Sequence, residues 1–254
     1  MISRLLSAAL AAGFLAAVVS TGLQLSLTSP LILEAERYET PDAQAAMTRS
    51  PALPIVHAHL QLVHGGHDHG AAPDAPHAWQ PGEGLPRMAF TGLATLIGGV
   101  GYALLLGAVM LALGREPTPE RALSFAIAGF LSVALAPGLG LPPELPGSEA
   151  APLAARQAWW LMTAAATAMG LYLIAIRRAA ISIVGGLVLI VAPHIVGAPE
   201  VAAAKSELPA GLAAQFAARS LAVGFVFWAV IGLAYGWAWQ VFGRGRAASG
   251  PARA

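Results

Sequence analysis

The sequence contains no cysteine, and only 11% of its 254 residues are charged. The missing thiols exclude disulfides, thiolate zinc sites and iron–sulfur clusters, so a bound metal must use nitrogen and oxygen ligands, with thioether sulfur a weaker option. Such ligands favour Co, Ni, Zn or Mn over Cu(I). A soluble domain is typically about 25% charged, whereas this chain is 57% hydrophobic. The composition therefore predicts an integral membrane protein whose apolar surface is covered by a lipid bilayer.

Several motifs of enzymes are missing as well. The chain has a single lysine, Lys205, and no phosphate-binding loop, no His-Glu-x-x-His motif and no Gly-x-Ser-x-Gly elbow. These absences argue against an ATPase, a membrane metalloprotease and a serine hydrolase. The net charge of +1 gives no reason to expect a nucleic-acid partner. We expect no enzymatic activity and no resident cofactor.

Six apolar runs approach the roughly 20 residues that a helix needs to cross a bilayer. They cover residues 5–30, 88–113, 122–141, 157–176, 179–197 and 220–242. None alternates in the manner of a barrel strand. The runs predict an all-α membrane protein in which residues 1–254 form one integral membrane domain, a bundle of about six transmembrane segments with proline-broken helix ends. The first run is too long for a typical signal peptide, which favours an uncleaved first helix.

The connections between the runs alternate in length and charge. With the N-terminus in the cytoplasm, the short inner connections and the termini carry eight of the fourteen basic residues, and the long outer connections carry eleven of the thirteen carboxylates. Basic residues concentrate on the cytoplasmic side of membrane proteins. We therefore expect a multi-pass protein of a bacterial-type inner membrane with both termini cytoplasmic. Residues 34–87 then form an extracytoplasmic, histidine-rich loop.

Six of the seven histidines fall within this loop, which makes it the strongest indication of function. The candidate ligands are His57, His59, His64, His67, Asp68, His69 and His77. Imidazole is the commonest side-chain ligand for borderline divalent metals, and short histidine-rich tracts are typical of metal binding. Glycines make the backbone flexible, so ordering the loop around a metal costs entropy and favours capture with fast exchange. The alternative is a solvated linker in which histidine is incidental, and the clustering favours metal capture.

Three further candidates lie beside the apolar runs. Pro193 is expected to break the fifth run and free backbone carbonyls near His194; the alternative is an ordinary interfacial histidine. Residues 137–147 are too rich in proline and glycine to continue a helix, and form either a re-entrant loop that holds Glu144 at the mouth of the bundle or a rigid turn. Glu36 lies in a charged stretch that either attracts cations or only ends the first helix.

Two weaker patterns concern packing. Leu208, Leu212 and Phe216 recur at helical spacing, which is typical of a short interfacial helix, although an ordinary connector explains them equally well. Gly232 and Gly236 form a Gly-x-x-x-Gly pair that predicts close packing between helices, most simply within the chain. Few side chains near the middle of the runs are polar, apart from Gln24 and several Ser, Thr and Tyr residues. The sequence thus leaves open how an ion would cross the midplane.

These elements together resemble the CbtA family of predicted cobalt transporter subunits. The resemblance runs along almost the whole chain. It rests on the segments Ala35–Glu39, His67–Gly70 with Ala78–Pro81, Leu139–Gly147, Gln157–Trp160, Ala192–His194 with Gly197–Pro199, and Leu208–Pro209 followed by Phe216. It implies cobalt uptake, often with a small single-span partner, CbtB.

The combined expectation is transport of a divalent transition-metal ion, Co²⁺ first, across the inner membrane. The loop histidines gather the ion, and Glu144, His194 and Glu36 or Glu200 form the entry site. The alternatives are a Ni²⁺ or Zn²⁺ transporter and a membrane subunit that captures metal outside and presents it to a partner. A CbtB-like subunit or a homo-oligomer would complete the pathway.

Overall fold

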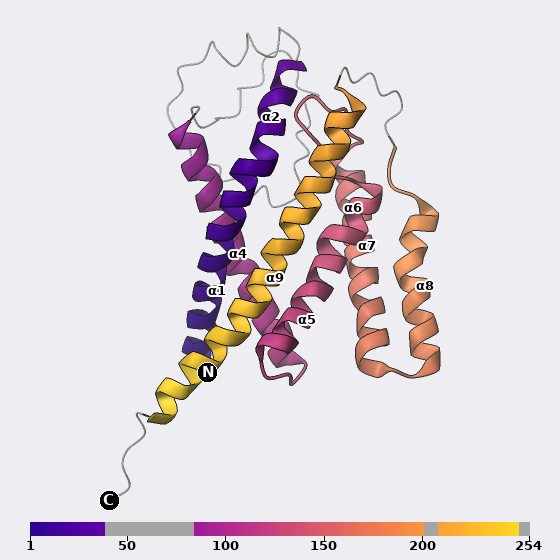
Figure 1. Cartoon of the computed structure of the whole chain (residues 1–254). Helices are drawn as coiled ribbons and strands as arrows, with labels where there is room; N and C mark the ends of the chain where they lie inside the picture. The colour runs from indigo at the N-terminus through magenta and orange to yellow at the C-terminus, as the bar shows by residue number, and fades with distance from the viewer. Residues whose placement is uncertain (39–83, 201–207, 249–254) are drawn as a thin grey trace, which may run out of the picture.

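The computed structural model describes residues 1–38, 84–200 and 208–248, with side chains described up to residue 243. Within these ranges every regular element is helical and no strand occurs, as Figure 1 shows. Five helical stretches are long and apolar enough to cross a membrane: Ile2–Tyr38, Leu85–Ala112, Pro119–Gly140, Leu153–Arg177 and Ala210–Gly243. The predicted helical membrane fold is confirmed. The run expected at 179–197 is a shorter apolar helix of 17 residues, α8 (Ala180–Val196).

The bundle is built around the first and last helices. Helix α1 (Ile2–Leu23) packs against α4 (Leu85–Ala112) and α9 (Ala210–Ala248), and α9 also packs along α5 (Pro119–Phe130). Helix α7 (Leu153–Tyr172) pairs with α8 as an antiparallel hairpin at one side (Figure 1). The hairpin meets the rest of the bundle through the segment that leads from α5 to α7, so this segment holds the two parts together.

Small residues let the central helices approach closely. Ala8, Ala9, Ala12 and Ala16 on α1 are buried completely, and an ideal Cβ added to Gly13 would lie 2.5 Å from the backbone nitrogen of Val100 on α4. Without a hydrophobic driving force in lipid, helices gain stability from such close backbone contact. The contact fixes α1 within the core of the bundle.

The Gly232–Gly236 pair packs within the chain, as its spacing predicts. Added Cβ atoms would lie 2.7 Å from the Cβ of Ala126 and 2.5 Å from the backbone nitrogen of Pro119. Both neighbours belong to α5, so the pair brings α9 and α5 together. At the other end of α9, the Leu208, Leu212 and Phe216 pattern belongs neither to a separate interfacial helix nor to a connector. Leu212 and Phe216 lie in α9 itself, and Leu208 just before it, and all three pack with Leu31, Ala35 and Leu145.

We expect Gly236→Ala to lower the stability of the folded protein, because its added methyl group would meet backbone atoms that cannot move aside. Overpacking of this kind costs about 1–3 kcal/mol. The matched control is Gly101→Ala, since nothing lies within 4 Å of a Cβ added at Gly101. Alanine at an open helical glycine stabilises by roughly 0.5–1 kcal/mol. The melting temperatures of the two variants in detergent measure these effects. Equal melting temperatures would show that the helices α5 and α9 can move apart to accept the added methyl group at little cost.

Two of the long helices contain a short π-helix just before a proline. The π-helix η1 (Gln24–Thr28) precedes Pro30, which opens α2 (Ser29–Ala35). The π-helix η3 (Leu131–Leu135) precedes Pro137 in α6 (Ala136–Gly140). Proline has no N–H to donate and its ring clashes with the carbonyl four residues earlier, and a π-bulge is a common way to absorb such a disturbance. The helix therefore continues past Pro137 and ends at Gly140, within one residue of the end predicted for the run 122–141.

Candidate metal-entry site

The two ends of the bundle differ in charge. One end, here called the acidic end, comprises η2 (Glu36–Tyr38), the connection 141–152, and residues 197–200 after α8. The other, the arginine end, comprises the turns at 113–118 and 177–179 (Figure 1). Of the ten predicted site residues, three lie in the described ranges, namely Glu36, Glu144 and His194, and all three are at the acidic end. The other seven, His57, His59, His64, His67, Asp68, His69 and His77, lie outside the described residues.

Glu144 is held by an arginine from the start of α7. Arg156 Nη1 donates to Glu144 Oε2 over 2.9 Å, and the side chains of Arg156 and Glu144 are 10% and 24% exposed. Burial raises the pKa of the Glu144 carboxyl, and the Arg156 charge opposes that rise. A carboxylate in this position is stabilised by a cation. Arg156 supplies one now, and a metal ion that bound Glu144 would take over part of that role.

The connection that carries Glu144 is pinned over the acidic end. Leu145, next to Glu144, is 3% exposed and packs with Leu31 of α2 and Leu212 of α9. Gly147 has a φ of +78°, which permits the turn that follows, and the Ser148 backbone N–H donates to the Leu145 carbonyl. Glu144 is thus positioned by apolar anchoring and a tight turn, after α6 has ended at Gly140.

His194 lies against the same helix that holds Glu144. Its ring meets the ring of Trp159 edge to face, with the centroids 6.0 Å apart. Trp159 is 6% exposed and lies three residues after Arg156, so the two belong to one face of α7. The expected break at Pro193 does not occur there. Helix α8 continues through Pro193 and His194 to Val196, where Gly197, with a φ of +88°, ends it.

The buried face of α7 carries a line of polar atoms without partners. The side-chain atoms Arg156 Nε, Trp159 Nε1, Thr163 Oγ1 and Thr167 Oγ1 are buried and make no hydrogen bond. Their residues follow at spacings of three and four, which places them along one face. From Arg156 to Thr167 the helix rises about 16 Å, roughly half the thickness of a bilayer core. Sequence reasoning missed this line, although the spacing from Trp159 through both threonines was visible.

The line of polar atoms ends at a close contact between α7 and α8. An ideal Cβ on Gly170 would lie 2.6 Å from the Gly186 carbonyl oxygen, and one on Gly186 equally close to the Gly170 carbonyl. No side chain separates the two backbones here. The π-helix η4 (Leu173–Arg177) follows and leads to the arginine end. The polar face of α7 therefore starts beside Glu144 and His194 and stops, in this conformation, at the Gly170–Gly186 contact.

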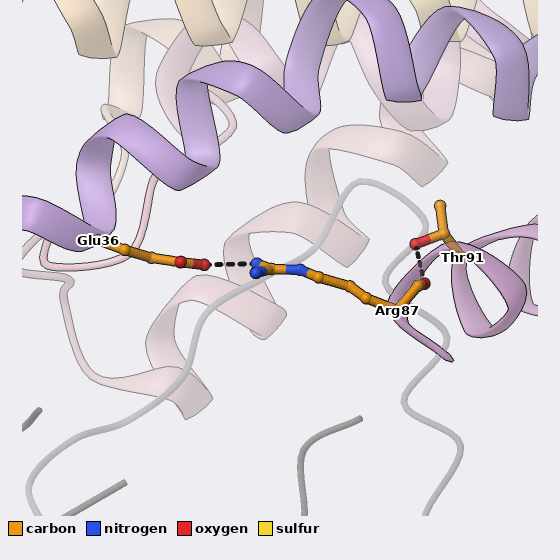
Figure 2. A network of polar contacts seen from close by, with 3 residues as sticks. All are labelled: Glu36, Arg87 and Thr91. Atoms are coloured by element: carbon orange, nitrogen blue, oxygen red, sulfur yellow. Dashed lines mark hydrogen bonds and ion pairs between the residues drawn. The ribbon is translucent and has the colours of Figure 1, made fainter. Parts of the chain in front are cut away.

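Glu36 is paired at the acidic end, as Figure 2 shows. Arg87 Nη2 donates to Glu36 Oε1, and the Thr91 hydroxyl donates to the Arg87 carbonyl over 2.9 Å. Glu36 belongs to η2 and Arg87 to the first turn of α4. About a third of each paired side chain is exposed, so the pair adds little to stability. Its effect is geometric, because it joins the two helical ends between which residues 39–83 run.

A smaller polar contact lies between α1 and α4. The Thr95 hydroxyl is 3.2 Å from Gln24 Oε1 and 2.8 Å from the Thr91 carbonyl. Thr95 is buried. Gln24, the amide that the sequence placed near the middle of a span, therefore serves the α1–α4 contact. Within the described residues, no three His, Asp or Glu side chains gather into a group able to hold a metal ion.

Comparison with known proteins adds one finding. The family described as probable cobalt transporter subunit (CbtA) matches residues 2–240. No curated protein and no solved structure matches the chain. The matched range includes every helix that the structure describes except the last residues of α9.

Proposed function

The chain belongs to the CbtA family of probable cobalt transporter subunits, and from this membership we propose that it admits Co²⁺ at the acidic end and passes it along the polar face of α7. The chain is a multi-pass helical membrane protein. In the proposal the acidic end is extracytoplasmic, the arginine end is cytoplasmic and the membrane is the inner membrane. The histidines of residues 57–77 collect the ion outside.

The observation that carries this proposal is the line of unbonded polar atoms on α7. A buried hydroxyl without a hydrogen-bond partner costs about 1–3 kcal/mol of stability. Because Thr163 and Thr167 both carry this cost, we infer that their hydroxyls serve a function. Ionisable groups inside membrane proteins usually face the bundle interior or a water-filled cavity and mark ion pathways, and the two threonines continue the line that begins at Arg156. The two threonines supply oxygen atoms where the sequence had suggested few, and hard or borderline cations accept such ligands.

The entry step uses the residues that α7 brings together. His194 offers an imidazole beside Trp159, and Glu144 offers a carboxylate whose charge is balanced by Arg156. When a cation binds Glu144, Arg156 is released from part of its pairing, so binding and a local rearrangement are coupled. Glu36 is paired with Arg87 and Glu200 is exposed, and we assign both to attracting cations.

The membrane potential suffices to drive the ion inward. Moving one charge across 100 mV is worth about 2.3 kcal/mol, so a divalent ion gains about 4.6 kcal/mol. This corresponds to roughly three decades of accumulation. The account therefore needs no ATP. Ni²⁺ and Zn²⁺ accept the same ligands and remain alternative cargoes.

A second candidate function is supported by the Gly170–Gly186 contact. The polar face of α7 closes there before it reaches the arginine end. A subunit that binds metal at the acidic end and presents it to a partner, such as a CbtB-like single-span protein, needs only the part of this path between the acidic end and the Gly170–Gly186 contact. A transporter that works alone must separate α7 from α8 at this point during each cycle.

Cysteine accessibility tests the proposed path, since the chain has no cysteine of its own. We expect Thr163→Cys to react with a small charged thiol reagent added from outside, and Co²⁺ to slow the reaction. Ala165→Cys is the matched control, because Ala165 lies at the same depth on the exposed face of α7, where lipid excludes a charged reagent. If the reagent failed to react with the cysteine at either position, the result would contradict a water-accessible path along this face.

A further inference from the structure

A cavity of about 300 Å³ opens at the arginine end. In Figure 1 this end of the bundle lies opposite the acidic end, where the proposed entry site is. The cavity lies between the start of α5 and the end of η4. Three arginines, Arg115, Arg121 and Arg178, line it together with Ser124, and Phe125 and Ile176 provide an apolar wall. This composition, cationic on one side and apolar on the other, does not follow from metal transport.

The backbone holds the three arginines at the cavity. Gly114, with a φ of +65°, turns the chain after α4, and the Arg115 backbone N–H donates to the Met110 carbonyl over 2.8 Å. Thr118 caps α5 by accepting from the Arg121 backbone N–H. Arg178 has a φ of +54°, a conformation that costs a side-chain-bearing residue energy. Its Nε donates to the Ala175 carbonyl over 2.8 Å, which fixes the guanidinium beside the cavity.

The positive charges in the cavity are only partly balanced, because the one carboxylate that interacts with them in the described part of the chain, Glu120 beside Arg121, lies outside the cavity. No carboxylate lines it, and within the described residues none of its three arginines forms a salt bridge. Glu116 of the same turn reaches toward Arg4 instead, and Glu120 is fully exposed. Like charges that line one cavity repel one another, and an anion bound between them offsets that repulsion. The cavity is therefore electrostatically complementary to an anion.

We propose that this cavity binds a phosphate-bearing anion, the headgroup of an anionic phospholipid. Guanidinium forks bind phosphate oxygens in a bidentate manner. Basic pockets between transmembrane helices on the cytoplasmic side are typical binding places for such headgroups, and Phe125 and Ile176 offer apolar surface to the attached chains. The bound headgroup would join the α7–α8 hairpin to α5 at the arginine end, where the Arg178 turn and the first turn of α5 meet.

The test uses the full chain purified in a neutral detergent. Phosphatidylglycerol is expected to raise its melting temperature and to remain bound in native mass spectra, whereas phosphatidylcholine does neither. Inorganic phosphate is the third probe. A shift with phosphate as large as that with phosphatidylglycerol would support the phosphate site and assign its source to a soluble anion. Equal shifts with phosphatidylglycerol and phosphatidylcholine would overturn the proposal.

Substitutions locate the site. Arg115→Gln combined with Arg121→Gln is expected to reduce retained phosphatidylglycerol at least several-fold. Arg115→Lys combined with Arg121→Lys should give a smaller loss, because lysine keeps the positive charge and the membrane orientation but lacks the bidentate guanidinium group. Arg177→Gln is the matched control, since Arg177 is exposed on the same turn and does not line the cavity. If the double glutamine variant does not fold, phosphatidylglycerol retention by the double lysine variant tests the site instead. Retention by the folded lysine pair equal to that of the unchanged protein would contradict the site.

Discussion

Replacing Thr163 and Thr167 together with valine is expected to abolish most cobalt uptake while leaving the protein folded and at least as stable. Both hydroxyls are buried and unbonded, so valine, which has nearly the same shape, removes a desolvation cost of about 1–3 kcal/mol per group. The same change removes two oxygen atoms from the proposed path. Uptake and stability should therefore move in opposite directions, which packing alone does not explain.

The measurement pairs labelled Co²⁺ uptake into vesicles with thermal unfolding in detergent. Thr91→Val is the matched control, because the Thr91 hydroxyl already donates to the Arg87 carbonyl and lies on α4, outside the proposed path. It should lower stability slightly and leave uptake unchanged. Normal uptake by the Thr163 and Thr167 double variant, with raised stability, would mean that the two hydroxyls only fill space.

Replacing His194 with alanine is expected to reduce the maximal uptake rate more than removing His64, His67 and His69 together. We expect a loss of about tenfold for His194→Ala, equivalent to about 1.4 kcal/mol, because this imidazole is held in place against Trp159 and needs no ordering when it binds metal. The loop histidines act before entry. Their loss should raise the Co²⁺ concentration needed for half-maximal uptake and leave the maximal rate nearly unchanged.

Rates measured over a range of Co²⁺ concentrations separate the two effects. Trp159→Phe serves as a control for the ring contact, since it keeps an aromatic face for His194 but removes the unbonded indole N–H. It should retain more activity than His194→Ala. If the triple loop variant lost transport at saturating metal while His194→Ala did not, the loop would be the site of entry and the bundle residues would be secondary.

The apolar runs were sufficient to predict the helical bundle, because a backbone in lipid has to satisfy its own hydrogen bonds. They were less informative about where helices end. Composition predicted a break at Pro193, yet α8 contains this proline and continues to Val196. At Pro137 the preceding π-helix absorbs the missing hydrogen bond, and such local rearrangements have no simple sequence signal.

The sequence was sufficient to predict individual residues of the candidate site but not the contacts between them. The rarity of Glu144 and His194 beside apolar runs pointed to both, but no sequence pattern indicates that Arg156 pairs with Glu144 or that Trp159 lies against His194. These contacts depend on how α7 packs against its neighbours, which a single sequence does not specify. The spacing of Thr163 and Thr167 was visible, and only their burial without partners makes them candidates for function.

The most direct test of the central claim is labelled Co²⁺ uptake by sealed vesicles that contain this chain and no other protein. With an inside-negative potential imposed and the acidic end outward, the account predicts uptake well above that of empty vesicles, and a strong reduction when the potential is collapsed. Binding of Co²⁺ without uptake above empty vesicles would contradict transport by this chain alone and would support presentation of the ion to a partner.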